Sequence, residues 1–210
     1  MKLLALSDIH ADETALDRLR TVAMRDAYDA VIIAGDITHN GPVSFAQEVL
    51  ELFDGKLFCV HGNMDGPDVV SALSASPSFI HGKKVKFGSW NIVGLGGSNP
   101  TPFHTPSEYS EEEIGRVLEA AKVDEFTILV SHPPPQGILD NVGTMNVGST
   151  AVRACIEKQR PIVTICGHIH EVEGQKIAGD TLVVKLGPAS SLRAAEINFG
   201  DEIEVKFITF

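Results

Sequence analysis

The sequence predicts an α/β fold, because short apolar segments alternate with amphipathic segments along its first third. Ala30–Ala34 is wholly apolar and stops at Gly35 and Asp36. Such a run, bounded by turn residues, is typical of a strand buried on both faces of a parallel sheet. Ligand-binding groups in open α/β sheets collect beyond the carboxyl ends of such strands. We therefore expect Asp36 to lie at the rim of a sheet, facing a crevice.

The first third of the chain has the order β-α-β-α-β. Its strands are expected at 2–7, 30–34 and 56–60, and its helices at 11–26 and 44–53. The first helix places Leu16, Leu19 and Val22 on one face at helical spacing. Right-handed crossovers bring the carboxyl ends of all three strands to one edge.

The middle of the chain is less regular. We expect a short helix at 67–75, a hairpin of strands 84–88 and 90–95, and a long loop at 96–109. Loops of that length inside a compact domain are usually functional. Ser110 and Glu113 form a capping box that opens a helix reaching Val123.

The last part of the chain returns to strands. Strands are expected at 126–130 and 162–166, with a second loop up to Gly148 and a helix capped by Ser149 between them. Antiparallel-looking strands are then expected at 171–178, 181–186, 191–198 and 202–209. The last one alternates, with Ile203, Val205 and Phe207 on one face. No linker or repeat interrupts the pattern, so we expect one domain over residues 1–210.

Composition and charge narrow the classes of function. The hydrophobic share of 43% and the charged share of 21% are ordinary for a soluble globular protein. No segment approaches the ~20 apolar residues of a membrane span, and the apolar start is broken by Ser7 and Asp8 before it reaches signal-peptide length. A net charge of −11 argues against a general nucleic-acid binder. Three widely spaced cysteines in apolar contexts favour buried, reduced thiols in a cytoplasmic protein.

Polar side chains follow five of the expected strands. Each one alone is a weak signal, because short motifs such as Asp-x-His often arise by chance. Together they offer oxygen and nitrogen ligands and no thiol, a set that suits Mn, Fe, Zn or Co. Their number exceeds what one tetrahedral ion takes, so we expect two ions that share a carboxylate, at the same end of one sheet. The set comprises Asp8, His10, Asp36, Asn63, His132, His168 and His170.

Five motifs, in this order, resemble the motif set of the calcineurin-like metallophosphoesterases. They are Asp8-x-His10, Gly35-Asp36, Gly62-Asn63-x-Asp65, His132 and Gly167-His168-x-His170. The segments 96–103, 131–134 and 187–189 further resemble a prokaryotic branch related to the cyclic-AMP phosphodiesterase Icc. The resemblance implies an α/β fold in which two facing mixed β-sheets are flanked by helices, a four-layer sandwich.

The resemblance also implies the roles of these residues. Asp8, His10 and His170 would hold one metal ion, Asn63, His132 and His168 would hold the other, and Asp36 would bridge them. The implied activity is hydrolysis of a small phosphodiester or phosphomonoester, by in-line attack of a hydroxide between the ions. Two divalent ions are expected as cofactors, with manganese first and iron, zinc, cobalt or nickel as alternatives.

One position departs from the family pattern. Many members have, after the Gly-Asn pair, a histidine that protonates the leaving oxygen, but this chain has Met64, which neither gives nor takes a proton. Asp65 keeps the family's acidic position and is expected to orient a neighbouring ligand. His39 and His104 are candidates to replace the missing acid. The predicted catalytic residues are therefore Asn63, Asp65 and His104. A structural role is expected for His61, His81 and Trp90.

Two other functions stay open. The chain could be a non-catalytic interaction scaffold on the same fold, like the retromer subunit of this superfamily, but that reading predicts lost metal histidines, and all are present. It could also be a nuclease of the superfamily, which the net charge of −11 disfavours. The expected partner is a small phosphorylated substrate, with no membrane and no nucleic acid; an oligomer remains open.

Overall fold

Two β-sheets pack face to face in the computed structural model, which describes residues 1–25, 27–53 and 55–210. The first sheet has the order β13-β12-β1-β2-β3 and comprises β1 (Lys2–Leu6), β2 (Ala30–Ala34), β3 (Leu57–Val60), β12 (Arg193–Phe199) and β13 (Ile203–Thr209). The second has the order β10-β11-β9-β6-β5-β4 and comprises β4 (Lys84–Phe87), β5 (Trp90–Leu95), β6 (Thr127–Ser131), β9 (Val163–Cys166), β10 (Gly174–Ala178) and β11 (Thr181–Lys185).

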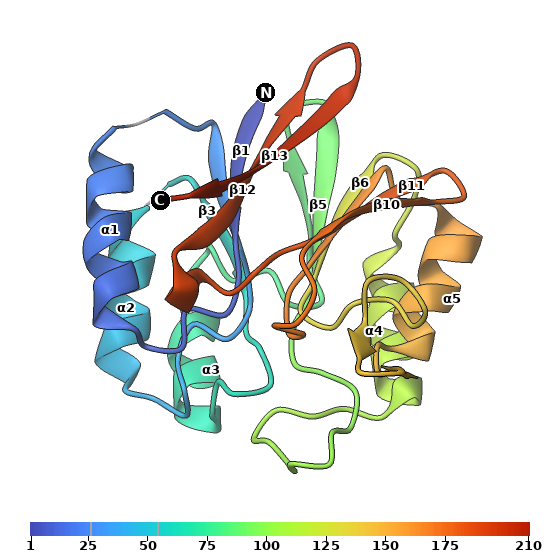
Figure 1. Ribbon diagram of the computed structural model, residues 1–210, viewed down its shortest axis with the longest axis horizontal. Helices are drawn as coiled ribbons and strands as arrows, with labels where there is room; N and C mark the ends of the chain where they lie inside the picture. Colours follow the sequence, from blue (N-terminus) through green and yellow to red (C-terminus); the bar gives the residue numbers. More distant parts are fainter. Residues whose placement is uncertain (26, 54) are drawn as a thin grey trace.

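Helices cover the outer face of each sheet, as Figure 1 shows. The first sheet is covered by α1 (Glu13–Met24), α2 (Val43–Leu52) and α3 (Pro67–Ser74). The second is covered by α4 (Glu111–Ala121) and α5 (Thr150–Gln159). The order helix, sheet, sheet, helix confirms the predicted α/β fold with two facing mixed sheets in a four-layer sandwich. Among the described residues, no helix is both long enough and apolar enough to cross a membrane.

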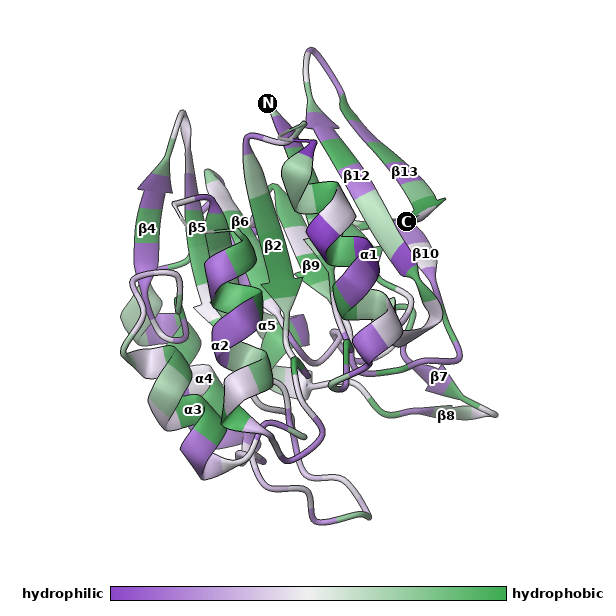
Figure 2. Cartoon of the chain, turned by 90° about the vertical axis from the view of Figure 1, so that its left-hand side faces the viewer, coloured by the Kyte–Doolittle hydropathy of each residue, from purple (hydrophilic) through white to green (hydrophobic). Residues whose placement is uncertain are grey.

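The strand β2 is buried on both of its faces, as its apolar run predicts. Val31 and Ile33 pack towards the helices, whereas Ile32 packs between the two sheets. Figure 2 shows β2 in green behind α1 and α2, whose outward faces carry the hydrophilic residues. Burial on both faces removes a large apolar area from water, at about 25 cal/mol per Å², so this strand anchors the residues that follow it.

The predicted helix caps are present. Ser110 and Glu113 form the capping box of α4, and Ser149 accepts from Val152 N at 3.1 Å to cap α5. The helix expected at 11–26 begins later, because Asp12 caps it by accepting from Ala15 N at 2.8 Å. It ends at Met24, and the predicted end at Asp26 lies outside the described residues.

The last strands pair differently from the prediction. β11 is antiparallel to β10, as predicted, but parallel to β9. The prediction that 181–186 pairs only in the antiparallel sense is therefore wrong for its pairing with β9. The reason is that the β10–β11 hairpin turns the chain back into the direction of β9. β12 then crosses to the first sheet, where it is antiparallel to β1. The loop before Gly148 also contains a short hairpin of β7 (Asn141–Val142) and β8 (Met145–Asn146), which the sequence did not predict.

The polar residues predicted as ligands follow strands of both sheets. Those before residue 64 follow β1, β2 and β3 of the first sheet, whereas His132, His168 and His170 follow β6 and β9 of the second. The expectation that all of them lie at the end of one sheet is therefore wrong. The carboxyl ends meet because the sheets face each other, as the family resemblance implies.

Candidate metal centre

Several candidate ligands adopt a left-handed backbone directly after their strands. The φ angle is 60° at Asp8, 53° at His10, 50° at Asp36 and 73° at His168. A positive φ is uncommon for residues other than glycine, and such strain concentrates at functional sites. The backbone therefore turns sharply at the end of each strand and places these side chains on one rim.

Asp8, His10 and His170 form one group of potential ligands, whose ligand atoms lie within 4.8 Å of one another. His170 Nε2 lies 3.3 Å from Asp8 Oδ1 and 3.3 Å from His10 Nε2. His10 Nδ1 is buried without a hydrogen-bond partner. The structure thus brings together the three residues predicted to hold the first ion.

A second group of atoms within 4.8 Å comprises Asp8, Asp36 and His132. Asp36 Oδ2 lies 3.7 Å from His10 Nε2 and 3.5 Å from His132 Nε2. The other oxygen of this carboxylate accepts from Met64 N at 2.8 Å, which fixes its orientation. Asp36 therefore presents one oxygen between a histidine of the first group and the histidine of the second.

The ring of His132 lies among oxygen atoms that accept hydrogen bonds. Its Nδ1 donates to the carbonyl oxygen of Ala34 at 2.8 Å, so Nε2 faces Asn63 Oδ1 at 2.8 Å and Asp36 Oδ2 at 3.5 Å. Both of those oxygens are acceptors, and a neutral imidazole offers them only a lone pair. Burial lowers the pKa of His132, but the carboxylates of Asp36 and Asp8 outweigh it and raise the pKa to about 9. The donor set therefore favours a positive charge at this point, which a divalent cation would supply.

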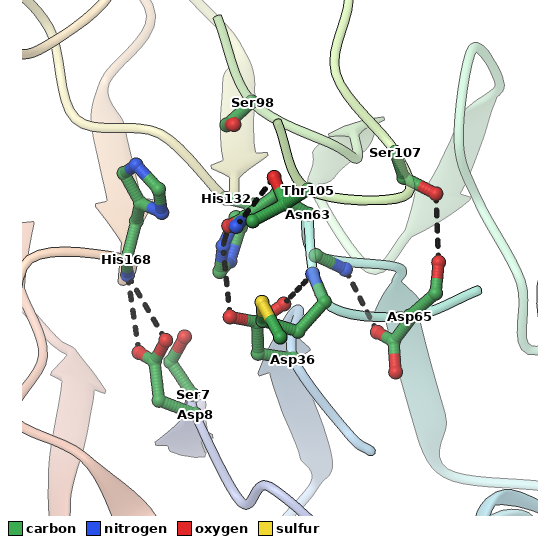
Figure 3. A network of polar contacts seen from close by, with 12 residues as sticks. Ser7, Asp8, Asp36, Asn63, Asp65, Ser98, Thr105, Ser107, His132 and His168 are labelled. Atoms are coloured by element: carbon green, nitrogen blue, oxygen red, sulfur yellow. Dashed lines mark hydrogen bonds and ion pairs between the residues drawn. The ribbon is translucent and has the colours of Figure 1, made fainter. Parts of the chain in front are cut away.

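His168 lies at the site in a different way. Its backbone N–H donates to both Asp8 carboxylate oxygens, at 3.2 and 3.1 Å. Its ring points away from that carboxylate (Figure 3), and its centroid lies 5.0 Å from that of His132. Among the residues that the structure describes, His168 belongs to neither close group. Burial and the charge of His132 lower its pKa to about 3, so the ring stays neutral, as a metal ligand must be.

The charge of Asp8 is strongly favoured. Burial alone would raise its pKa, but the hydrogen bond with His170 and the charges of His132 and Lys185 bring the pKa well below its usual range. The hydrogen bond with Asp8 in turn raises the pKa of His170.

Lys185 is a residue of this site that the sequence reading missed. It is fully buried, and its Nζ donates to the carbonyl oxygens of Ile169 at 2.6 Å and Leu186 at 2.7 Å. Ile169 N bonds in turn to Gly167 O at 2.9 Å, across His168 with its positive φ, which is the strained form of a γ-turn. Lys185 thus holds the turn that carries both histidines. A lone lysine inside an apolar strand was the available signal.

Asp65 ties together the loops that carry Asp36 and Asn63. It is fully buried and accepts from Thr38 N at 2.8 Å and Gly62 N at 2.8 Å. Burial and the charge of Asp36 raise its pKa to about 6. These contacts are those of a residue that orients its neighbours.

The candidates for the missing acid lie nearer the surface. The ring of His39, an exposed residue, has its centroid 5.6 Å from that of His10. His104 is exposed in the loop at 96–109, and Met64 is half-buried. His61 is buried, with Nε2 3.0 Å from the Tyr109 hydroxyl, and burial lowers its pKa to about 3. That environment agrees with the structural role expected for it.

Comparison with known proteins identifies the family. Residues 1–199 match the calcineurin-like phosphoesterase superfamily domain. An uncharacterised protein of Methanocaldococcus jannaschii, MJ1162, is 36% identical over 199 residues, which cover 90% of this chain and 89% of the relative. The chain belongs to the calcineurin-like phosphoesterase superfamily, as its motifs predicted.

Solved structures share the fold. The protein TT1561 of Thermus thermophilus has a TM-score of 0.73 at 18% identity, with 98% of this chain and 97% of that chain covered. An archaeal phosphodiesterase has a TM-score of 0.61 at 14% identity, with coverage of 99% and 100%. The chain thus has the fold of these phosphoesterases, with groups of candidate metal ligands at the rim between its sheets.

Proposed function

We propose that this chain is a two-metal phosphoesterase that hydrolyses a small phosphodiester in preference to a phosphomonoester, as a single domain over residues 1–210. The observation that carries the proposal is the position of Asp36 Oδ2, 3.7 Å from His10 Nε2 and 3.5 Å from His132 Nε2. One carboxylate oxygen between two histidines is the arrangement that a bridging ligand needs.

The donor set fits two divalent transition-metal ions. Asp8, His10 and His170 would hold the first, and Asn63, His132 and His168 would hold the second. Asp36 would bridge the two. Supporting this fit are the position of His132 Nε2, which faces Asn63 Oδ1 and Asp36 Oδ2, and the absence of thiols among these residues. Manganese is the first candidate, because carboxylate and carbonyl oxygens suit it, and the imidazoles keep iron, zinc, cobalt and nickel as alternatives.

When bound, the ions would supply a nucleophile activated at neutral pH and neutralise charge on the phosphate. The chain holds the ligands in place. Ala34 O accepts from Nδ1 of His132 and orients its ring, and Met64 N orients Asp36. Asp65 ties the loop of Asp36 to that of Asn63. Met64 gives no proton, so the leaving oxygen takes its proton from water or leaves as an anion.

The preference for diesters draws support from the solved structure of an archaeal phosphodiesterase, which shares the fold over the whole chain. The missing histidine at position 64 removes an acid that a poor alkyl leaving group needs, and this affects diesters and monoesters alike. The three cysteines are buried free thiols, which supports the expected reducing, cytoplasmic compartment.

Hydrolysis assays of metal-free protein reloaded with Mn²⁺ test the proposal. The substrates are bis(4-nitrophenyl) phosphate, 4-nitrophenyl phosphate and cyclic nucleotides. We expect Mn²⁺-dependent hydrolysis, fastest on a diester, and its loss in Asp36→Ala. Asp180→Ala, which removes an exposed carboxylate paired with Arg160, is the matched control and should keep the parent's rate. Equal turnover with and without metal, or no turnover of any ester, would overturn the proposal.

A further inference from the structure

The side-chain amide of Asn63 is held at both ends. Asn63 is buried, and its Oδ1 lies 2.8 Å from His132 Nε2. Its Nδ2 donates to Thr105 Oγ1 at 3.0 Å, as Figure 3 shows. Only the oxygen of an amide coordinates a metal ion, because its NH₂ group is a donor. Which end faces the site therefore decides whether Asn63 is a ligand.

Glu108 decides the direction of this hydrogen-bond chain. Its Oε1 lies 2.6 Å from Thr105 Oγ1, and an ionised carboxylate only accepts. The single hydroxyl proton of Thr105 must therefore go to Glu108, which leaves the lone pairs of Oγ1 for the NH₂ group of Asn63. Burial would raise the pKa of Glu108, but hydrogen bonds from Thr101 and Thr105 outweigh it and lower the pKa to about 2. The carboxylate stays ionised at neutral pH. The hydrogen bonds therefore have one possible direction, from the Asn63 NH₂ group to Thr105 Oγ1 and from the Thr105 hydroxyl to Glu108.

The same carboxylate oxygen shapes the loop at 96–109. Glu108 Oε1 also accepts from Thr101 Oγ1 at 2.6 Å and from Thr105 N at 2.7 Å. Ser107 N donates to Asn63 O at 3.0 Å, which ties the loop to the backbone of the residue it orients. The hydroxyl of Thr105 is thus held in place on two sides.

We propose that Thr105 and Glu108 are positioning residues that keep the amide oxygen of Asn63 turned towards the metal centre. We call the chain Asn63–Thr105–Glu108 the amide relay. The inference rests on the proposed function, because it assumes that Asn63 is a ligand of the second ion. A reversed amide would bring its NH₂ group towards the cation and its oxygen against the lone pairs of Thr105. The relay removes that alternative before any ion binds.

Calorimetric titration of metal-free protein with Mn²⁺ tests the relay. Thr105→Val replaces the hydroxyl by a methyl group of similar size, and we expect one of the two binding events to weaken about 10–100-fold, as is typical when a group that orients a ligand is lost. The other event should stay within about threefold of the parent, because the hydroxyl of Thr105 bonds to Asn63 and Glu108 and not to Asp8, His10 or His170. Thr105→Ser keeps the hydroxyl and should restore the affinity.

Thr101→Val is the matched control. Thr101 donates to the same Glu108 oxygen, but the Asn63 amide donates to Thr105 and not to Thr101. Both affinities should therefore stay within about threefold of the parent. Equal weakening by Thr101→Val and Thr105→Val would show that only the loop's shape matters, and would overturn the relay. Glu108→Gln provides a second variant. The NH₂ group of its glutamine can donate to Thr105 Oγ1, so the Thr105 hydroxyl is free to donate to Asn63 and the direction of the relay is no longer fixed. We expect it to weaken the same event as Thr105→Val.

Failure of the relay and failure of the proposed function give different results. If the parent binds two ions and hydrolyses esters while Thr105→Val binds both ions normally, the relay is wrong and the function stands. If the parent binds no Mn²⁺, both are wrong. Melting curves of the metal-free variants show whether each one is folded. If Thr105→Val does not fold, Glu108→Gln takes its place. Unchanged Mn²⁺ affinities in Glu108→Gln would then overturn the relay.

Discussion

His132 Nδ1 donates to the carbonyl oxygen of Ala34 across 2.8 Å, and this bond joins the carboxyl-terminal edges of the two sheets. Ala34 ends β2 in the first sheet, and His132 follows β6 in the second. The rings and carboxylates of the site meet at this junction. This close approach requires a glycine directly after Ala34, because a Cβ on Gly35 would lie 2.4 Å from His132 Nδ1.

Gly35→Ala should therefore disturb the metal site as well as the fold. The backbone has φ +93°, and such a conformation costs a residue with a side chain about 1–2 kcal/mol before any clash. We expect a lower melting temperature and weaker Mn²⁺ binding. Gly179→Ala, with φ +61° and open space around it, is the control and should change stability alone. Normal Mn²⁺ affinity in Gly35→Ala would contradict the role given to the junction.

The loop at 96–109 should govern substrate preference. Phe103 is 81% exposed on this loop, which contacts the ligand-bearing loop through Asn63 and Thr105. We expect Phe103→Ala and His104→Ala to change the ratio of kcat/KM between diesters and monoesters while Mn²⁺ binding stays unchanged. Phe126→Ala, at an exposed phenylalanine before β6, is the matched control. If both loop variants keep the parent's substrate profile, the loop is only a connection.

Because Met64 cannot donate a proton, the rate of hydrolysis should depend strongly on the leaving group. General acid catalysis typically contributes 10²–10⁴-fold, so its absence should be felt most with alkyl esters, whose leaving groups are poor. We expect kcat/KM to fall steeply as the leaving-group pKa rises, and Met64→His to flatten that dependence. The measurement is a series of aryl and alkyl esters in both proteins. A shallow dependence in the parent would show that another group, with His39 or His104 first, already supplies the proton.

Lys185→Met should loosen the turn that carries His168 and His170. The variant keeps most of the side chain's volume but leaves two buried carbonyl oxygens without a donor, at a cost of about 1–3 kcal/mol. We expect a lower melting temperature and weaker Mn²⁺ binding. Lys176→Met, on the exposed side of β10, should change neither. Unchanged stability and metal affinity in Lys185→Met would mean that the turn holds itself.

The sequence predicted those parts of the fold that depend on local pattern. The strand at 30–34 has the predicted bounds because its apolar run ends at a glycine, and α4 and α5 begin at the predicted caps because Ser110 and Ser149 act within one turn. The pairing of β12 with β1 joins opposite ends of the chain, and no local pattern encodes it. The β7–β8 hairpin was not predicted, because each of its strands has only two residues, too few to show an alternation of apolar and polar side chains.

The candidate site divides in the same way. Asp8, His10 and His170 come together as predicted, because their motifs directly follow strands. Lys185 bonds to Ile169, 16 residues before it, and Thr105 accepts from Asn63, 42 residues before it. Such contacts between separate segments leave little sign in the local sequence around either residue. The ring of His168 points away from Asp8, and its backbone has a positive φ; residue type alone determines neither.

The number of Mn²⁺ ions bound per chain at saturation tests the two-metal site most directly. We predict two ions in the parent, measured by calorimetric titration and elemental analysis of the same sample. In Asp36→Ala we predict that both are lost or weakened, since the oxygen of Asp36 lies within 3.7 Å of one histidine and 3.5 Å of the other. One ion per chain in the parent, or normal occupancy in Asp36→Ala, would contradict a centre bridged by Asp36.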